Sequence, residues 1–291
     1  MTDPDVSTDV STQAGRALRA FNVLHSTVYF APEADEEYVA AGLRPGRMGY
    51  FASRSAPMGA VGPDVVTAAF YNFNPELVAR HIPRAWSLAS PEQVIAARWK
   101  VADRTLRRLL GEDVIGSPEF ARAAELLTAA ARECRIEGRA LFAGHAGLTW
   151  PTEPHLVFWH AVTLLREHRG DGHIAVLMAA ELSGIEALVT HTATGRGMLP
   201  AAAKALRMWS DDEWAAAEAG LTGRGLLDGH GALTEVGERQ RVQIESDTDR
   251  LGAGPWRNVD ESAVDQLISY GKMLTRIVIA AGGLPDQVFA S

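Results

Sequence analysis

Apolar residues recur at helical spacing along most of the chain, in segments rich in Ala, Leu, Arg and Glu, which are strong helix formers. Several segments begin with a capping residue followed by proline, as at Ser90-Pro91 and Ser117-Pro118, because proline fits the first position of a helix. Segments that alternate apolar and polar residues, as strands do, are scarce. The pattern therefore predicts a mainly α protein.

The predicted helices are bounded by caps at their starts and by glycine or a change of spacing at their ends. They cover 90–110, 117–138, 152–168, 173–191, 200–209, 210–224, 234–251 and 261–281, and a further helix starts at Asn74. Gly170-Asp171-Gly172 is predicted to be a turn that folds the next helix back antiparallel. The last helix, 261–281, carries too much apolar surface to leave in water, which predicts a homodimer formed through it.

The segment from Ser210 to Leu251 has the pattern of the end of a winged helix, namely a helix, a short hairpin at Gly229-His230-Gly231 and a second helix. Its phrases RGLLD, GALTEVGER and TDRL resemble the multidrug-resistance-regulator (MarR-like) branch of winged-helix proteins. The phrases GYFASRSAPMGAV and LREHRGDGHIAVLMAAELSGIEALV resemble a little-studied actinobacterial helix-turn-helix family. The first resemblance implies a winged-helix fold that holds aromatic ligands, and the second brings no assigned activity.

Two stretches of the chain resemble one another at a nearly constant offset. His25 to Glu33 aligns with His145 to Glu153, and Arg84-Ala-Trp-Ser aligns with Arg207-Met-Trp-Ser. We interpret this as a diverged tandem repeat of two winged-helix-like halves with a small β-wing in the second. The predicted organisation is a disordered tail at 1–12, helical halves at 13–144 and 145–258, and a closing or dimerisation helix at 259–291.

The charge balance argues against nucleic acid as the main partner. Acidic residues number 36 and basic residues 28, which gives a net charge of −8. The helix in the position of a recognition helix starts Ser210-Asp-Asp-Glu, whereas base readout requires Arg, Lys, Asn or Gln at such a position. We interpret it as a degenerate DNA-reading helix.

Cysteine content and hydropathy place the protein in a reducing, aqueous compartment. Cys134 is the single cysteine, so no disulfide framework can form. Neither a signal peptide nor a continuous apolar stretch of membrane-spanning length is recognised, and the prediction is a cytoplasmic protein without a membrane partner.

Titratable residues are densest between 155 and 173. His160 and Glu167 are seven residues apart and share a helix face, while His173 follows Asp171 in what is predicted to be the first turn of the next helix, where the helix dipole lowers its pKa. These four residues are candidates for acid–base catalysis, and His168 borders them as a ligand-binding candidate. Buried structural histidines are a second interpretation, and a metal or haem site a third, although no HExxH spacing is present.

Ligand-binding candidates in the first half are Arg47, Tyr50, Arg54 and Asn72, because small residues among aromatics admit a flat ligand and arginine binds carboxylate or phosphate. His25 and His145, matched by the repeat, are predicted to face one another. No dinucleotide or phosphate-loop fingerprint is found, so the cofactor is undefined.

Three functions follow from the sequence. The first is binding of a planar or acidic metabolite by a protein of winged-helix ancestry. The second is a His-dependent acid–base enzyme of secondary metabolism, either cofactor-free or assisted by a metal. The third is a MarR-like transcriptional regulator. The first is preferred because the recognition helix is acidic.

Overall fold

The computed structural model describes residues 8–284, and within this range the chain forms helices and no strand, which confirms the mainly α prediction. The helices are α1 (Thr8–Ser26), α2 (Pro32–Ala40), α3 (Arg47–Ser55), α4 (Pro63–Phe70), α5 (Pro75–Ala79), α6 (Pro91–Ile115), α7 (Pro118–Arg132), α8 (Ala140–Ala146), α9 (Pro154–Ala179), α10 (Gly184–Thr192), α11 (Pro200–Arg207), α12 (Asp211–Gly223), α13 (Glu235–Gly252) and α14 (Glu261–Ala280). Residues Thr8 to Thr12, expected in the tail, are already helical, and residues 1–7 of that tail lie outside the described range.

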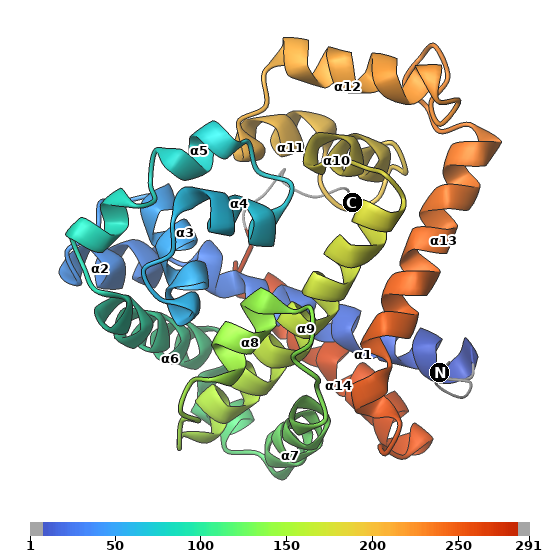
Figure 1. The fold of residues 1–291 in the computed structure, drawn as a ribbon. Coiled ribbons are helices and arrows are strands. Elements are labelled where there is room, and N and C mark those ends of the chain that lie inside the picture. The colour runs from blue at the N-terminus through green and yellow to red at the C-terminus, as the bar shows by residue number, and fades with distance from the viewer. Residues whose placement is uncertain (1–7, 285–291) are drawn as a thin grey trace.

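The helices pack around two hydrophobic clusters that α9 connects (Figure 1). The larger cluster joins α1 to α8 with the first half of α9 and with α14, and Phe158 and Leu164 are the contributions of α9 to it. The smaller cluster joins α10 to α13 and includes Leu177 from the second half of α9. In Figure 1, α2 to α6 lie to one side of α9, and α12 forms the outer layer above α10 and α11.

Side-chain caps start the helices where the sequence predicted them. Ser90 and Ser210 each form a capping box with Gln93 and Glu213, in which the serine hydroxyl accepts an N–H of the first turn and the longer side chain accepts the serine N–H. Ser117 caps α7 through the N–H of Phe120. Each cap is worth about 1 kcal/mol. The starts of α6, α7 and α12 therefore follow from local chemistry alone.

The turn predicted at Gly170-Asp171-Gly172 is wrong, because α9 continues through it to Ala179. Asp171 accepts the backbone N–H of Phe142 at 2.9 Å instead of capping a new helix. Gly172 provides room, since a Cβ there would lie 2.6 Å from Nη1 of Arg139. The chain turns only near Glu181, whose φ is +54°. The next helix, α10, starts there.

The predicted β-wing is not confirmed. A single antiparallel bridge joins Leu227 and Leu233, and no strand is found in residues 8–284. The carboxylate of Asp228 accepts the N–H groups of His230 and Ala232 at 2.8 and 3.0 Å, so a side chain organises this turn. The two winged-helix halves and their repeat relation stay predictions.

The apolar face of α14 is covered within the chain. Leu267, Leu274 and Val278 are buried where α14 packs along α1 and α6. The close approach to α1 requires Gly271, because a Cβ there would lie 3.0 Å from the ring of Phe21. The surface that suggested a homodimer therefore has an intramolecular partner, and the dimer itself stays a prediction.

Hydropathy within residues 8–284 gives no single helix long and apolar enough to cross a membrane. Only α9 and α10 taken together reach the required length and composition, and the pair is bent by 99°.

Candidate functional site

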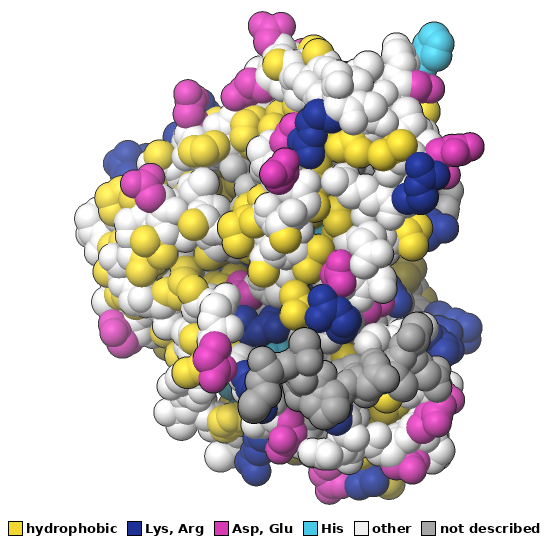
Figure 2. All heavy atoms as spheres, turned by 45° about the vertical axis from the view of Figure 1, so that its right-hand side comes forward, with side chains coloured by type: hydrophobic (Ala, Val, Ile, Leu, Met, Phe, Trp, Pro, Cys, Tyr) yellow, Lys and Arg dark blue, Asp and Glu magenta, His cyan; other side chains and the backbone are white. Residues whose placement is uncertain are grey.

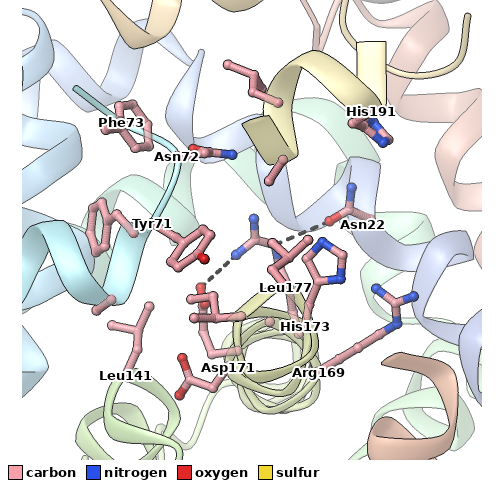
Figure 3. A pocket seen from close by; sticks show the side chains of 18 of the residues that line it. Asn22, Tyr71, Asn72, Phe73, Leu141, Arg169, Asp171, His173, Leu177 and His191 are labelled. Carbon is pink, nitrogen blue, oxygen red and sulfur yellow. Dashed lines mark hydrogen bonds and ion pairs between the residues drawn. The ribbon is translucent and has the colours of Figure 1, made fainter. Parts of the chain in front are cut away.

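A cavity of about 440 Å³ lies between the two hydrophobic clusters, within the size range of small-molecule sites (Figure 3). Its walls come from α1, from α3 and α4, from the segment 71–73, and from α8, α9, α10, α11 and α13. Of the residues singled out in the sequence, it is lined by Tyr50, Arg54, Asn72, Glu167, Asp171 and His173. The cavity thus joins residues from both predicted halves.

Arginines outnumber carboxylates around this cavity. The arginines are Arg19, Arg54, Arg166, Arg169, Arg207 and Arg241. The carboxylates are Glu167, Asp171 and Glu245. Asp249 on α13 pairs with Arg19 and Arg169 and adds one further negative charge nearby. A positive charge surplus remains around the cavity, and such a surplus favours anions.

Arg54 and Glu167 form a buried ion pair that lines the cavity. Nη2 and Nε of Arg54 donate to Oε2 and Oε1 of Glu167 at 2.8 and 3.3 Å, and Nη1 donates to the hydroxyl of Tyr50 at 3.1 Å. Arg166 donates to the same carboxylate at 2.7 Å and to Asn22 at 3.2 Å. Burial alone would raise the pKa of Glu167, but the two guanidinium groups hold it well below its usual range.

Arg207 is the cationic group of the cavity whose charge no carboxylate balances. Its Nε donates to Oδ1 of Asn72 at 3.1 Å, and its guanidinium lies 4.1 Å from the ring centre of Phe73. Within the described residues no carboxylate lies within 4 Å of it. Burial lowers the pKa of Arg207, and the nearby Arg54 lowers it further. Both effects would be relieved by an anion at this position.

Arg241 presents a similar excess of donors on the opposite side, on α13. Its Nη2 donates to Glu245 at 3.2 Å, and that carboxylate also accepts from Arg169 at 3.2 Å. Arg241 is only 6% exposed, and its Nε and Nη1 are buried without a hydrogen-bond partner among residues 8–284. Buried donors of this kind are rare unless a ligand or water completes them.

Hydrogen bonding sets the tautomer of His173. The hydroxyl of Thr248 donates to the carbonyl of Ile244 at 2.6 Å, so its one proton is already used. It must therefore accept the N–H of Nδ1 of His173, which lies 2.8 Å away. Burial lowers the pKa of His173 to about 4, so the ring is neutral and Nε2 carries a free lone pair. The lowered pKa was predicted, but the predicted cause is wrong, because His173 lies inside α9 and not at a helix start.

His160 lies outside the cavity, although it shares a helix face with Glu167. Its ring packs against Trp99 and Trp150, with ring centres 5.3 and 4.7 Å away. Seven residues of helix separate His160 from Glu167 by about 10 Å along the axis, and the cavity reaches only the second position. The predicted acid–base group of His160, Glu167 and His173 is therefore not assembled in one site.

The remaining sequence candidates also lie elsewhere. Arg47 donates to the carbonyls of Ala205 and Leu206 at 3.0 and 3.3 Å and so caps the end of α11. His168 packs against Phe142 with ring centres 5.3 Å apart. His25 and His145 are fully buried and do not line the cavity.

Sequence reasoning missed the arginines that give the cavity its charge. Arg207 was noticed only as part of the repeat, where Arg-Met-Trp-Ser matches Arg-Ala-Trp-Ser. Arg166 and Arg241 carry no local signal, because each stands close to other charged residues in the sequence and only packing shows which face is internal. A search for arginines with no acidic residue nearby in the sequence would have favoured Arg47 and Arg54 and not Arg207, which Asp211 follows by four residues.

The helix α12 carries an acidic start and not a basic one. Asp211 pairs with Lys204, and Glu213 caps its own helix while accepting from Asn74 at 3.1 Å. In Figure 2 acidic side chains stand out along the upper edge, where α12 lies, and no continuous basic patch covers this face. The acidic start of α12 is therefore a physical reason to expect that this helix makes poor contacts with phosphates or bases.

The fold and the cavity together define an all-helical protein with an arginine-rich internal site. The model of the helix-turn-helix family matches residues 14–285, so the chain belongs to this family. No curated protein and no solved structure matches significantly. Among residues 8–284 no group of three or more His, Cys, Asp or Glu residues is placed to hold a metal ion.

Proposed function

We propose that the protein binds a small organic anion in the cavity between its two hydrophobic clusters. The observation that carries this proposal is Arg207, a largely enclosed guanidinium that has Asn72 and Phe73 as neighbours but no carboxylate within the described residues. A carboxylate or phosphate would balance its charge and accept its remaining N–H groups.

The other residues that line the cavity indicate which chemical groups the rest of the ligand should carry. Phe70, Phe73 and Tyr50 supply aromatic surface beside Arg207, which suits an apolar or planar body. On the far side Nε2 of His173 can accept a hydrogen bond, so a hydroxyl or N–H group on the ligand would be matched there. The proposed ligand is thus an acid with an aromatic or apolar body and one further donor.

Binding of simple acids tests the proposal. We expect phenylacetate to bind the full-length protein at least ten-fold more tightly than neutral phenylacetamide, measured by calorimetric titration. Arg207→Met should weaken phenylacetate about 10- to 100-fold, since a hydrogen bond to a charged group is worth about 1.5–3 kcal/mol. The matched control is Arg104→Met, because Arg104 pairs with Glu36 and Glu37 on the surface. Equal binding of the acid and the amide, or no binding of either, would contradict the proposal.

Family membership supports a second candidate, a DNA-binding transcriptional regulator whose response the ligand controls. The acidic start of α12 argues against direct base contacts by that helix. Submicromolar binding to DNA that weakens steeply with salt would establish this candidate. The anion-binding proposal does not depend on that result.

A further inference from the structure

A second group of polar residues, all buried except the half-buried Tyr29, lies behind Tyr50 and outside the ligand cavity. We call it the Arg98 cluster, and it consists of His25, Tyr29, Tyr38, Arg98 and Trp159. The residues come from α1, the short 3-10 helix Thr27–Tyr29, α2, α6 and α9. Tyr29 touches both sites, since its ring centre lies 5.1 Å from that of Tyr50.

Arg98 is a buried cation without a counter-ion. Its side chain is 3% exposed, and no carboxylate of the described residues lies within 4 Å of it. Its one hydrogen bond runs from Nη2 to the hydroxyl of Tyr29 at 3.3 Å, while Nη1 has no partner among residues 8–284. The faces of Trp159 and Tyr29, with ring centres 4.7 and 5.6 Å from Cζ, supply only partial compensation.

The neighbours of Arg98 add donors and no negative charge. Nε1 of Trp159 and both ring nitrogens of His25 are buried and lack partners within the described chain, and the buried hydroxyl of Tyr38 approaches Ser53 and Arg98 without a well-formed hydrogen bond. His25 stacks on Trp159, with ring centres 5.5 Å apart and planes inclined by 6°. Burial and the nearby arginines lower the pKa of His25 well below its usual range, so its ring is neutral and offers one N–H.

Glu167 favours the charged form of Arg98 only from a distance and makes no direct ion pair with it. Its two oxygens are already occupied by Arg54 and Arg166, each through a direct ion pair. Burying a charge with neither a counter-ion nor a full set of hydrogen bonds is strongly unfavourable. The cluster therefore combines a formal positive charge with several unused N–H and O–H donors, which is the environment that a small anion requires.

We infer that the Arg98 cluster binds a chloride ion, held by the guanidinium of Arg98 and by donors among Tyr38, Trp159 and His25. Chloride fits this set because it is monovalent, accepts hydrogen bonds from several directions and needs no cationic partner other than the one arginine. This site is separate from the organic-anion cavity, and the two proposals stand independently.

The test is the stability of the full-length protein in salts of matched ionic strength. We expect the thermal midpoint to rise by about 3 °C between 1 and 100 mM chloride or bromide, with sodium gluconate making up the ionic strength, because a ligand of the native state stabilises it. Arg98→Met should abolish this rise. Arg108→Met is the control on the same helix, since Arg108 pairs with Glu33, and Arg207→Met excludes a contribution from the ligand cavity; both should retain the rise.

The stability of Arg98→Met at low salt distinguishes an ion-binding role of Arg98 from a purely structural one. At 1 mM chloride this variant should be at least as stable as the parent, because an unbalanced buried charge has been removed. A halide-independent parent, or a variant that keeps the full halide response, overturns the proposal. If Arg98→Met does not fold, crystals of the parent grown in bromide decide the matter. An anomalous peak beside Arg98 supports the site, and its absence there, as expected for bound water, refutes it.

Discussion

Replacing Glu167 with glutamine is expected to lower the free energy of unfolding by about 3–5 kcal/mol. Glutamine keeps the shape of the side chain, but Arg54 and Arg166 lose the carboxylate that both of them bind. Because Arg54 is 9% exposed, little water can reach its guanidinium to replace that carboxylate. Urea unfolding followed by circular dichroism measures the loss.

The control for this variant is Glu36→Gln. Glu36 also pairs with an arginine, Arg104, but it is 59% exposed, so its loss should change the free energy of unfolding by less than about 1 kcal/mol. A Glu167→Gln protein as stable as the Glu36→Gln protein would show that the buried pair is not a stabilising element. The native pKa of Glu167 is depressed, so its contribution is present above the unfolded pKa and is lost as pH falls through the native pKa.

Acid is expected to unfold the protein cooperatively, with a midpoint at about pH 5. Burial lowers the pKa of His145 and of His168 to about 3 and that of His160 and of His173 to about 4. A histidine with a depressed native pKa stabilises the fold fully above its unfolded pKa near 6.5, and this stability is lost as pH falls toward the native pKa. Each such group contributes up to about 1.4 kcal/mol per pH unit.

Asp171 works in the opposite direction over part of this range. Burial raises its pKa to about 6, so its protonation returns some stability as pH falls below that value. Histidines with a lowered pKa outnumber this one carboxylate, so the net result is a loss of stability as pH falls. Circular dichroism and tryptophan fluorescence recorded between pH 8 and 4 measure it. His168→Gln should flatten the pH dependence, and His230→Gln should not, because His230 is exposed. Constant stability from pH 7 to pH 5 would disprove the prediction.

The fold was predictable where local chemistry determines it. The serine caps at Ser90, Ser117 and Ser210 place three helix starts correctly, because the side chain and the amide it binds are three residues apart. Gly172 led to a wrong prediction of a turn, because its missing side chain makes room for Arg139, which lies 33 residues away in the sequence. The Ser183–Glu186 capping box, which marks the true start of α10, was overlooked.

The candidate site was predictable only as separate pieces. Tyr50 and Arg54 were grouped from their spacing on one short segment, and Glu167 was grouped with histidines on another. Their union depends on the ion pair between α3 and α9, which joins residues 113 positions apart. Periodicity gives the face of a helix but not which neighbour covers it, and so His160 was assigned to a site that it does not reach.

The unbroken course of α9 has a consequence for how this sequence can diverge. The helix packs against α7 and α8 near its start and against α13 farther along, and the part in between lines the cavity. No long stretch of it is left to solvent, so a substitution almost anywhere on it must be matched by a change in another helix. We expect alignments of homologues to show 156–177 as the slowest-changing segment, with its exchanges correlated with those in α7 and α13.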